Sequence, residues 1–322
     1  MVDPIHTSHP LVLLAPMAGM TDVAFRSLCV DQGADITFSE MVSAKGLAYG
    51  SEKTASLMRP ADNEEGIIVQ IFGHEPETMA REAEHIEEML GSALFGIDIN
   101  MGCPARKIVK KGDGSALMRE PDLAARIVSS VRSAISSPLS VKFRRGYLLG
   151  EETCVDFACK MEEAGADMLT IHPRFAMQYY KGSAERAAIA RVVAATSVPV
   201  VGNGDIRCGA DALSLLEETG CAHVMVGRGA LGNPFIFHEI ACALGHQPLP
   251  HPPTTIERMQ MARRHARLLA DISDAALVRM RKHGHYYVSG LPGASAARRM
   301  LSTCTTLDEF DAVFAAVSEG LT

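Results

Sequence analysis

The sequence lacks three features that would each place it in a large class of proteins. No apolar run approaches the roughly 20 residues that a membrane-spanning helix needs, which argues against such a helix. The eight cysteines include no Cys-x-x-Cys pair, so neither a zinc site nor a disulfide framework is indicated, and we expect free thiols. The net charge of −7 argues against a protein that is basic throughout, although it leaves room for a local basic patch.

The N-terminal segment does not have the pattern of a secretory signal peptide. Residues 1–7 (MVDPIHT) have neither the basic start nor the apolar stretch of a secretory signal peptide. We therefore expect a cytoplasmic protein that has no membrane partner and holds no metal, and we expect it to act as a monomer.

Over most of its length, the chain alternates short apolar runs with helical patterns. The strand candidates are residues 11–15, 36–40, 67–72, 96–100, 139–143, 168–172, 198–203 and 222–227, and the helix candidates between them include 22–32, 75–90, 121–134, 155–164, 184–195 and 209–218. Eight such units predict parallel strands in a (β/α)₈ TIM barrel, an α/β fold. A doubly wound open sheet is the alternative, but its first turn is usually glycine-rich, and residues 16–20 (PMAGM) are not Gly-x-Gly-x-x-Gly.

A proline-rich joint ends this alternation. Its members are Pro248, Pro250, Pro252 and Pro253. After the joint, apolar residues such as Ile256, Met259 and Ala262 recur at helical spacing. We predict a barrel domain over residues 1–247 and a small all-helical C-terminal domain over residues 254–322.

Positive charge gathers in the predicted helical domain. Between residues 255 and 300 there are nine Arg or Lys residues against three acidic residues. This excess fits a nucleic-acid footprint, and it fits equally well the solvated face of amphipathic helices. Charge alone does not decide between the two.

The segment 97–104 (IDINMGCP) is the most informative part of the chain. Apolar and polar residues alternate over 97–100 as in a strand, and Gly102 and Pro104 then end the strand and fix a turn. A lone cysteine is most often a small buried apolar residue. Here the flanking turn residues favour the interpretation that Cys103 is a rigidly held, functional thiol.

Polar side chains end nearly every predicted strand. They are Glu40, Gln70, Asn100, Lys142, Arg144, His172, Asn203, Asp205 and Arg228. The carboxyl ends of barrel strands meet at one rim, where the active sites of this fold lie. Since a purely structural barrel needs no such residues there, the pattern predicts an active site.

Two glycine-containing loops predict a phosphate site. GNGD at 202–205 follows the seventh predicted strand, and GRGALG at 227–232 follows the eighth. Glycines let backbone N–H groups approach an anion, Arg228 can clamp it, and these two loops are the usual phosphate site of such barrels. The glycines could instead merely end strands, but their pairing with Arg228 favours phosphate binding.

Lys142 and Gln70 fit the edge of a flavin ring. A lysine at the end of an apolar run is costly to bury without an anionic or acceptor partner. The pyrimidine end of a flavin becomes anionic on reduction, and Gln70 could form amide-type hydrogen bonds to the same edge. His172 stays open between a core histidine, a phosphate or flavin contact and an acid, and considered alone it favours the core.

Nine segments together carry a resemblance to a known family. They are APMAGMTD (15–22), SEM (39–41), VQI (69–71), DINMGCP (98–104), GSAL (114–117), VKFR (141–144), TIH (170–172), GNGDI (202–206) and VGR (226–228). In this order they are highly specific, and over nearly its whole length the chain resembles a tRNA-dihydrouridine synthase. The bacterial B-type enzymes are the most similar subgroup.

The resemblance implies an FMN-containing barrel followed by a helical tRNA-binding domain. It implies that NADPH reduces FMN, that the flavin N5 delivers hydride to C6 of a uridine in tRNA, and that Cys103 donates a proton to C5. The implied cofactor contacts are Pro16, Met17, Ala18, Gln70, Lys142, His172, Asn203, Gly204, Asp205, Gly227 and Arg228. The implied substrate contacts are Asn100, Arg144, Arg174, Arg281 and Lys282, with Glu40 a further candidate.

The chain departs from the family pattern at a few positions. The segment after the sixth predicted strand reads HPRF at 172–175, where a glycine or alanine and a threonine are expected around the arginine. Arg145 and Asp113 stand where smaller or neutral residues are common. These differences concern RNA contacts and the choice of uridine rather than the flavin site.

Two other functions fit parts of the pattern. An FMN-dependent dehydrogenase acting on a free pyrimidine, such as dihydroorotate or dihydropyrimidine, would share the flavin, the lysine and the loop cysteine, but the basic helices favour RNA. A non-catalytic RNA-binding protein on a barrel scaffold would need neither Cys103 nor the flavin contacts.

Overall fold

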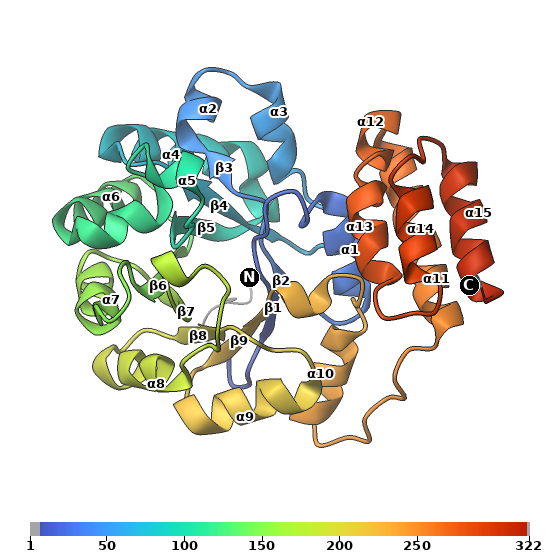
Figure 1. The fold of residues 1–322 in the computed structure, drawn as a ribbon. Helices are drawn as coiled ribbons and strands as arrows, with labels where there is room; N and C mark the ends of the chain where they lie inside the picture. The colour runs from blue at the N-terminus through green and yellow to red at the C-terminus, as the bar shows by residue number, and fades with distance from the viewer. Residues whose placement is uncertain (1–6, 321–322) are drawn as a thin grey trace.

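A closed sheet of parallel strands forms the centre of the computed structural model, which describes residues 7–320 (Figure 1). The strands are β1 (Val12–Leu14), β2 (Ile36–Thr37), β3 (Val42–Ser43), β4 (Ile67–Phe72), β5 (Leu94–Met101), β6 (Leu139–Gly146), β7 (Met168–Phe175), β8 (Val200–Asn203) and β9 (His223–Val226), in the spatial order β2-β1-β9-β8-β7-β6-β5-β4-β3. The sheet closes just after β2, where Phe38 bridges to Ile68 of β4. Eight strands therefore form the predicted barrel, and the short β3 is added beside β4.

Alternating side chains explain why the strands close on themselves. Leu13 of β1 belongs to a small apolar cluster inside the barrel, together with Met168, Val201 and Met225 from strands farther round the sheet. Its neighbour Leu14 belongs to the large cluster between the sheet and the helices. Because strand side chains point alternately to the two faces and both faces are buried, the strands have the nearly continuous apolar sequences that made them predictable.

The helices around the barrel match the predicted ones within two residues at each end. They are α1 (Val23–Asp31), α4 (Pro76–Leu90), α6 (Pro121–Ala134), α7 (Cys154–Glu163), α8 (Arg186–Ala195) and α9 (Gly209–Thr219). α4 and α6 begin with proline, which suits the first helical position because its missing N–H has no partner there. Four further helices lie in segments for which no helix was predicted, namely α2 (Ala44–Ala48), α3 (Glu52–Ala55), α5 (Arg106–Val109) and α10 (Ile236–Leu244).

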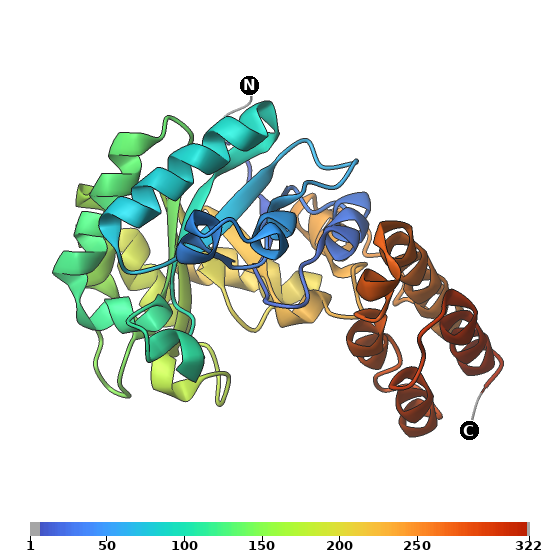
Figure 2. The ribbon, with the colours of Figure 1, turned by 90° about the horizontal axis from the view of Figure 1, so that it is seen from above.

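A group of helices follows the proline-rich joint and lies at one side of the barrel, next to α1 (Figures 1 and 2). Its members are α11 (Thr255–Ile272), α12 (Asp274–Leu277), α13 (Met280–Tyr287), α14 (Ala294–Leu301) and α15 (Leu307–Ser318). They share one apolar cluster, and Ala24 and Leu28 of α1 belong to the same cluster. The prediction that the C-terminal region is helical is thus confirmed, whereas the domain limits at residues 247 and 254 stay a prediction.

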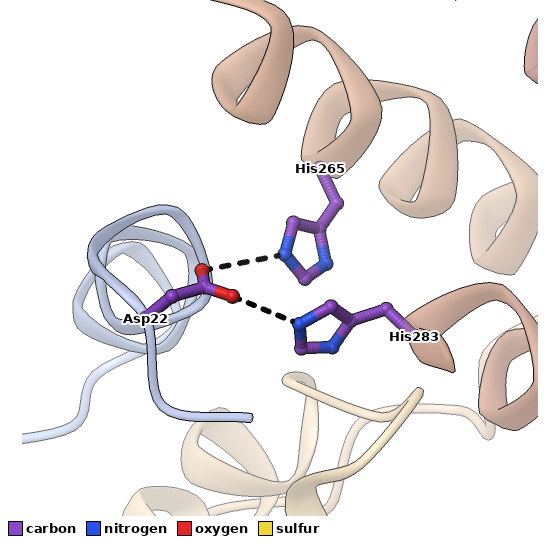
Figure 3. Close-up of side chains that lie close together, drawn as sticks. All are labelled: Asp22, His265 and His283. Carbon is purple, nitrogen blue, oxygen red and sulfur yellow. Dashed lines mark hydrogen bonds and ion pairs between the residues drawn. The ribbon is translucent and has the colours of Figure 1, made fainter. Parts of the chain in front are cut away.

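A buried polar cluster joins α1 to the C-terminal helices (Figure 3). Asp22 caps α1 by accepting from the N–H of Phe25 at 3.1 Å, and its other oxygen lies 3.0 Å from Nε2 of His283. Nε2 of His265 lies 3.9 Å from the capping oxygen, and Nδ1 of the same ring lies 3.2 Å from the hydroxyl of Tyr287. The ring of Phe25 stacks on His265.

Burial and the two imidazoles set the charge of this cluster. Burial by itself raises the pKa of Asp22, but the interactions with His265 and His283 outweigh it and hold the pKa well below its ordinary value. Burial lowers the pKa of His265 to about 4, although Asp22 opposes the shift. The carboxylate is therefore charged and His265 is neutral at pH 7. Asp22 and His283 thus form a charge-assisted hydrogen bond across the interface, and His265 lies beside it.

Among the described residues, no helix has both the length and the apolar character that crossing a bilayer requires. The prediction that the N-terminus carries no signal peptide concerns residues 1–7, of which all but Thr7 lie outside the described residues.

Candidate active site

A cavity of about 820 Å³ opens at the carboxyl ends of the barrel strands. Most of the predicted site residues line it, namely Pro16, Met17, Ala18, Asn100, Cys103, Lys142, Arg144, His172, Asn203, Gly204, Asp205, Gly227, Arg228 and Lys282. Gln70, Arg174 and Arg281 are not among the residues that line the cavity. The topology therefore brings together side chains that stand far apart in the sequence, as the strand-end pattern predicted.

Cys103 stands on a turn that is held from two sides. On one side, Oδ1 of Asn100 accepts from the backbone N–H of Cys103 at 2.9 Å and from that of Gly102 at 3.2 Å. On the other side, the N–H of Ser115 donates to the Cys103 carbonyl at 3.0 Å. Gly114 adopts φ +60°, and a Cβ there would lie 2.8 Å from that carbonyl, so glycine is needed for this approach.

The Cys103 thiol is half-buried in the cavity wall. Burial raises the pKa of this thiol, and the N–H of Ala105 and the charge of Arg144 only partly oppose the shift. The side chain is therefore protonated at neutral pH. A thiol in this state can act as a proton donor, whereas a nucleophilic role would require the thiolate.

Gln70 lies beneath the cavity floor and is fully buried. Its Nε2 donates to Asp98 at 2.6 Å, and its Oε1 accepts from Nδ2 of Asn100 at 2.8 Å. The prediction that Gln70 holds the ring edge of a flavin stays untested. The residue on which it depends, Asp98, was not among the predicted site residues, although its polar position in the apolar strand β5 was visible in the sequence.

Lys142 lies in the inner part of the cavity, and its Nζ donates to Oδ1 of Asn203 at 2.8 Å. Nδ2 of Asn203 donates in turn to the carbonyl of Met225 at 2.7 Å, which fixes the amide orientation. Burial lowers the pKa of Lys142 to about 7, and the charge of Asp98 opposes this shift. The ammonium group therefore gains from any anion that enters the cavity beside it.

The two loops that were predicted to hold phosphate lie against each other. A Cβ at Gly229 would lie 2.2 Å from the carbonyl oxygen of Ile206, so only glycine allows this contact. In the first loop, Asp205 has φ 54° and accepts from the N–H of Ala184 at 2.8 Å. Arg228 of the second loop lies 3.5 Å from Asp205 and leaves half of its side chain exposed.

Arg174 ties the first of these loops to the segment after β7 rather than facing the cavity. Its guanidinium donates to Asp205 at 2.6 Å and to the carbonyls of Lys181 and Gly182, and the residue is 1% exposed. The predicted direct substrate contact through Arg174 does not fit this placement, because the side chain is buried among the groups that it holds. The charge of Asp205 draws the arginine inward, a pairing that sequence spacing did not indicate.

His172 forms part of the cavity wall and is nearly buried. Burial, followed by the charges of Arg144 and Lys142, holds the pKa of His172 well below its ordinary value, so the ring is neutral. Its Nδ1 is buried and has no hydrogen-bond partner among the described residues. An unpartnered buried ring nitrogen beside a cavity favours a ligand contact over the core interpretation.

The C-terminal helices supply one side of the cavity. Lys282 and Tyr286 of α13 line it, and Nζ of Lys282 lies 3.4 Å from the carbonyl of Gly19. A Cβ at Gly232 would lie 2.4 Å from the backbone of Tyr286, so this glycine lets α13 approach the barrel loop closely. Arg281 instead donates to the carbonyl of Cys304 at 2.7 Å, within the helical region.

Three tyrosines that line the cavity were not predicted, namely Tyr179, Tyr180 and Tyr286. The ring of Tyr180 lies between two cations, with Arg228 4.6 Å and Arg144 5.5 Å from its centroid, and half of the ring is exposed. Tyr286 lines the opposite, helical side. Exposed aromatic residues in loops and on helix surfaces give no periodic signal, which is why the sequence pattern did not indicate them.

Comparison with known proteins shows similarity to one enzyme family over most of the chain. The family model described as dihydrouridine synthase (Dus) matches residues 13–320. The tRNA-dihydrouridine synthase B of Xanthomonas axonopodis is 38% identical, with 97% of this chain and 96% of that protein covered. The tRNA-dihydrouridine synthase B of Proteus vulgaris is 42% identical, with 81% of this chain and 80% of that protein covered. A crystal structure of mandelate oxidase shares the barrel fold, at 17% identity and a TM-score of 0.50, with 75% of this chain and 78% of that chain covered.

The fold, the cavity and these comparisons define an enzyme of the flavin-dependent oxidoreductase class. The chain belongs to the dihydrouridine synthase family, the tRNA-dihydrouridine synthases. This confirms the family resemblance found in the sequence. The B-type enzymes stand among the relatives, in line with the predicted subgroup.

Proposed function

We propose that this enzyme reduces the C5=C6 bond of a uridine in tRNA to dihydrouridine, with FMN as its bound cofactor, NADPH as reductant and Cys103 as general acid. One observation carries the proposal. A half-buried thiol, whose pKa burial raises, stands on a rigid turn in a barrel cavity whose other walls carry Lys142 and two glycine-containing loops with Arg228. That combination suits proton delivery to a planar substrate beside a phosphorylated cofactor.

The residues of the cavity fit FMN. Gly204, Gly227 and the half-exposed Arg228 offer backbone N–H groups and a guanidinium to a phosphate. Lys142 offers a cation to the ring edge, the unpartnered Nδ1 of His172 offers a polar contact, and the segment 16–18 lines the wall. About 820 Å³ is within the usual range of roughly 300–1,000 Å³ for cofactor and ligand sites.

The chain's own residues divide the remaining work. When bound and reduced, FMN supplies the hydride that adds to C6 of the uracil. The Cys103 thiol gives its proton to C5, and the resulting thiolate takes a proton from solvent before the next turnover. Asn100 and Arg144 border the same space and are placed to donate to the uracil oxygen on which negative charge develops.

RNA binding is assigned to the C-terminal helices and the cavity mouth. The uridine must leave its stack to reach the cavity, which costs a few kcal/mol, and phosphate contacts elsewhere can offset that cost. Lys282 and Arg281 belong to the basic segment of these helices. Since tRNA is the proposed substrate, we also place the enzyme in the cytoplasm.

Replacing Lys282 with alanine is expected to weaken tRNA binding and to reduce the magnitude of the negative slope of log K against log salt by about 1, because one phosphate contact is lost. The change suits the test because Lys282 is exposed at the cavity mouth. Filter binding at a series of salt concentrations measures both quantities. Arg126→Ala removes an exposed cation from α6 on the outer barrel and serves as the matched control. An unchanged slope for Lys282→Ala would remove this residue from the RNA contacts.

The proposed function is tested without oxygen. The purified protein is reduced with NADPH, unmodified tRNA is added, and the flavin absorbance is followed. We expect rapid reoxidation together with dihydrouridine in the recovered RNA. Flavin that stays reduced with tRNA but reoxidises with a free pyrimidine would favour the small-molecule dehydrogenase, and a protein that binds tRNA but no FMN would favour the non-catalytic alternative.

A further inference from the structure

A continuous chain of hydrogen bonds runs beneath the cavity from Asp98 to the backbone of Cys103. Asp98 accepts from the hydroxyl of Ser140 at 2.6 Å and from Nε2 of Gln70 at 2.6 Å. Oε1 of Gln70 accepts from Nδ2 of Asn100 at 2.8 Å, and Oδ1 of Asn100 accepts from the Cys103 N–H at 2.9 Å. The chain thus crosses from β6 through β5 to β4 and returns to β5 at the turn that bears the thiol.

The chemistry of the first member fixes the direction of all the others. Burial raises the pKa of Asp98 to about 7, and the hydrogen bonds of Ser140 and Gln70 and the charge of Lys142 oppose this shift. In its ionised form the carboxylate can only accept, so the Gln70 amide then turns its N–H toward Asp98 and its oxygen toward Asn100. Asn100 must then turn its N–H toward Gln70, which leaves its oxygen for the N–H groups of Gly102 and Cys103. If either amide rotated by 180°, a donor would face a donor or an acceptor would face an acceptor.

Burial makes such a mismatch costly. Asp98 and Gln70 have no exposed surface and Asn100 is 6% exposed, so water cannot replace a lost partner along most of the chain. The carboxylate lies within the sheet, and Lys142 on the neighbouring strand β6 is its charged neighbour. The place of Asp98 at the origin of these hydrogen bonds supplies a further reason for an acid in an otherwise apolar strand.

We propose that Asp98 is a positioning residue for the reaction: by orienting the amides of Gln70 and Asn100, it fixes the turn that holds the Cys103 thiol at the cavity. The inference rests on the proposed role of Cys103 as general acid. Asp98 itself touches neither the turn nor the thiol and acts through the two amides.

Reversing the donor-to-acceptor direction of these hydrogen bonds tests the proposal. In Asn100→Asp, a carboxylate faces the oxygen of Gln70, and Gln70 cannot turn its single N–H₂ group toward acids at both ends. Adding Asp98→Asn allows every bond to form in the opposite direction, from residue 98 to Gln70 and from Gln70 to residue 100, while the new carboxylate still accepts from the Cys103 N–H. The double variant also keeps the charge of the wild type.

The wild type, the two single variants and the double variant form a double-mutant cycle, and all four are compared as FMN-loaded enzymes. We expect Asn100→Asp to slow tRNA-dependent flavin reoxidation, and we expect Asp98→Asn to raise that rate at least tenfold in the Asn100→Asp background while giving no increase in the wild-type background. The loss of the Asn100 amide is common to both proteins in the first comparison, and removal of the Asp98 charge is common to both backgrounds. The difference between the two backgrounds therefore reports the coupling between residues 98 and 100, which contains the hydrogen-bond polarity and the repulsion between two buried acids.

A local readout follows the thiol without RNA. The rate of iodoacetamide alkylation at Cys103, measured on its peptide by mass spectrometry, should shift in Asn100→Asp and return toward the rate of Asp98→Asn when both changes are present. Cys159 and Cys208, which are also half-buried, should react at constant rates in all four proteins. If Asn100→Asp does not fold, recovery of folded, FMN-bound protein on adding Asp98→Asn supports the coupling.

Equal effects of Asp98→Asn in both backgrounds, or no recovery of a misfolded Asn100→Asp, would overturn the proposal. The role of Cys103 can fail separately. If Cys103→Ala reduced tRNA at the wild-type rate, the general acid would be misassigned, whereas the alkylation cycle would still show whether Asp98 positions the turn.

Discussion

Cys103→Ala is expected to bind FMN and to oxidise NADPH as the wild type does, yet to reduce uridine in tRNA about 10²- to 10⁴-fold more slowly, the usual contribution of a general acid. The thiol lies in the cavity wall and its carbonyl and N–H groups are held by Ser115 and Asn100, so removing the sulfur leaves the turn in place. Single-turnover reoxidation of NADPH-reduced enzyme by tRNA measures the loss, and the flavin content of the purified variant checks cofactor binding.

The pH profile adds an independent check on the same residue. An acid works while it is protonated, and burial raises the pKa of the Cys103 thiol above its ordinary value. The rate of uridine reduction should therefore stay level through neutral pH and fall only at alkaline pH, where the thiol ionises. Cys159→Ala, which removes another half-buried thiol, is the matched control. Wild-type turnover of tRNA by Cys103→Ala would exclude the thiol as the proton donor.

Asp22→Ala is expected to lower the free energy of unfolding by about 2.5 to 4 kcal/mol, because a charge-assisted hydrogen bond contributes about 1.5–3 kcal/mol and a helix cap about 1 kcal/mol. Asp22 supplies both, through His283 and through the N–H of Phe25. Urea unfolding monitored by circular dichroism measures the change. Asp31→Ala is the control, since it removes a more exposed acid that links the same α1 to Arg264 of α11. An exposed ion pair of this kind contributes at most about 1 kcal/mol.

The same cluster makes the fold sensitive to acid. The folded-state pKa of His265 is about 4, below its ordinary 6.5, so the unfolded chain binds this proton more readily. Stability is therefore complete above pH 6.5 and decreases as the pH falls toward 4, by about 2 kcal/mol from His265 at pH 5. The lowered pKa of Asp22 acts in the same direction, but only below its ordinary value of 3.8. Equal stabilities for Asp22→Ala and the wild type at pH 7 would mean that the cluster does not stabilise the interface.

The sequence was sufficient to predict the barrel because its strands are buried on both faces. Apolar runs such as 67–72 and 139–143 became β4 and β6, and the capped or proline-led helices between them kept their predicted limits. The predicted strand at 36–40 was only partly correct. It ends at Thr37, and the chain then bridges to β4 and resumes as β3. The four- and five-residue helices α2, α3 and α5 were missed because they span too few residues to show a period of 3.6.

The site residues that directly follow a strand could be predicted from the sequence. Cys103, Lys142, Asn203 and Arg228 follow strands whose carboxyl ends meet, so their convergence needed only the barrel. The orientation of Arg174 and the placement of Gln70 depend on partners in other strands and loops, Asp205 and Asp98, and no local pattern specifies such pairs. Tyr286 required knowing how α13 docks on the barrel.

The position of α13 also has a consequence for the order in which the protein is made. Lys282 and Tyr286 complete a cavity whose other walls come from residues 15–231, and Gly232 seats their helix against the barrel. On the ribosome, the strands and the phosphate loops emerge well before this helix. A nascent chain therefore presents an open barrel until its C-terminal helices are free to fold. Products truncated before residue 280 lack one wall of the cavity, which ties the finished active site to the completion of synthesis.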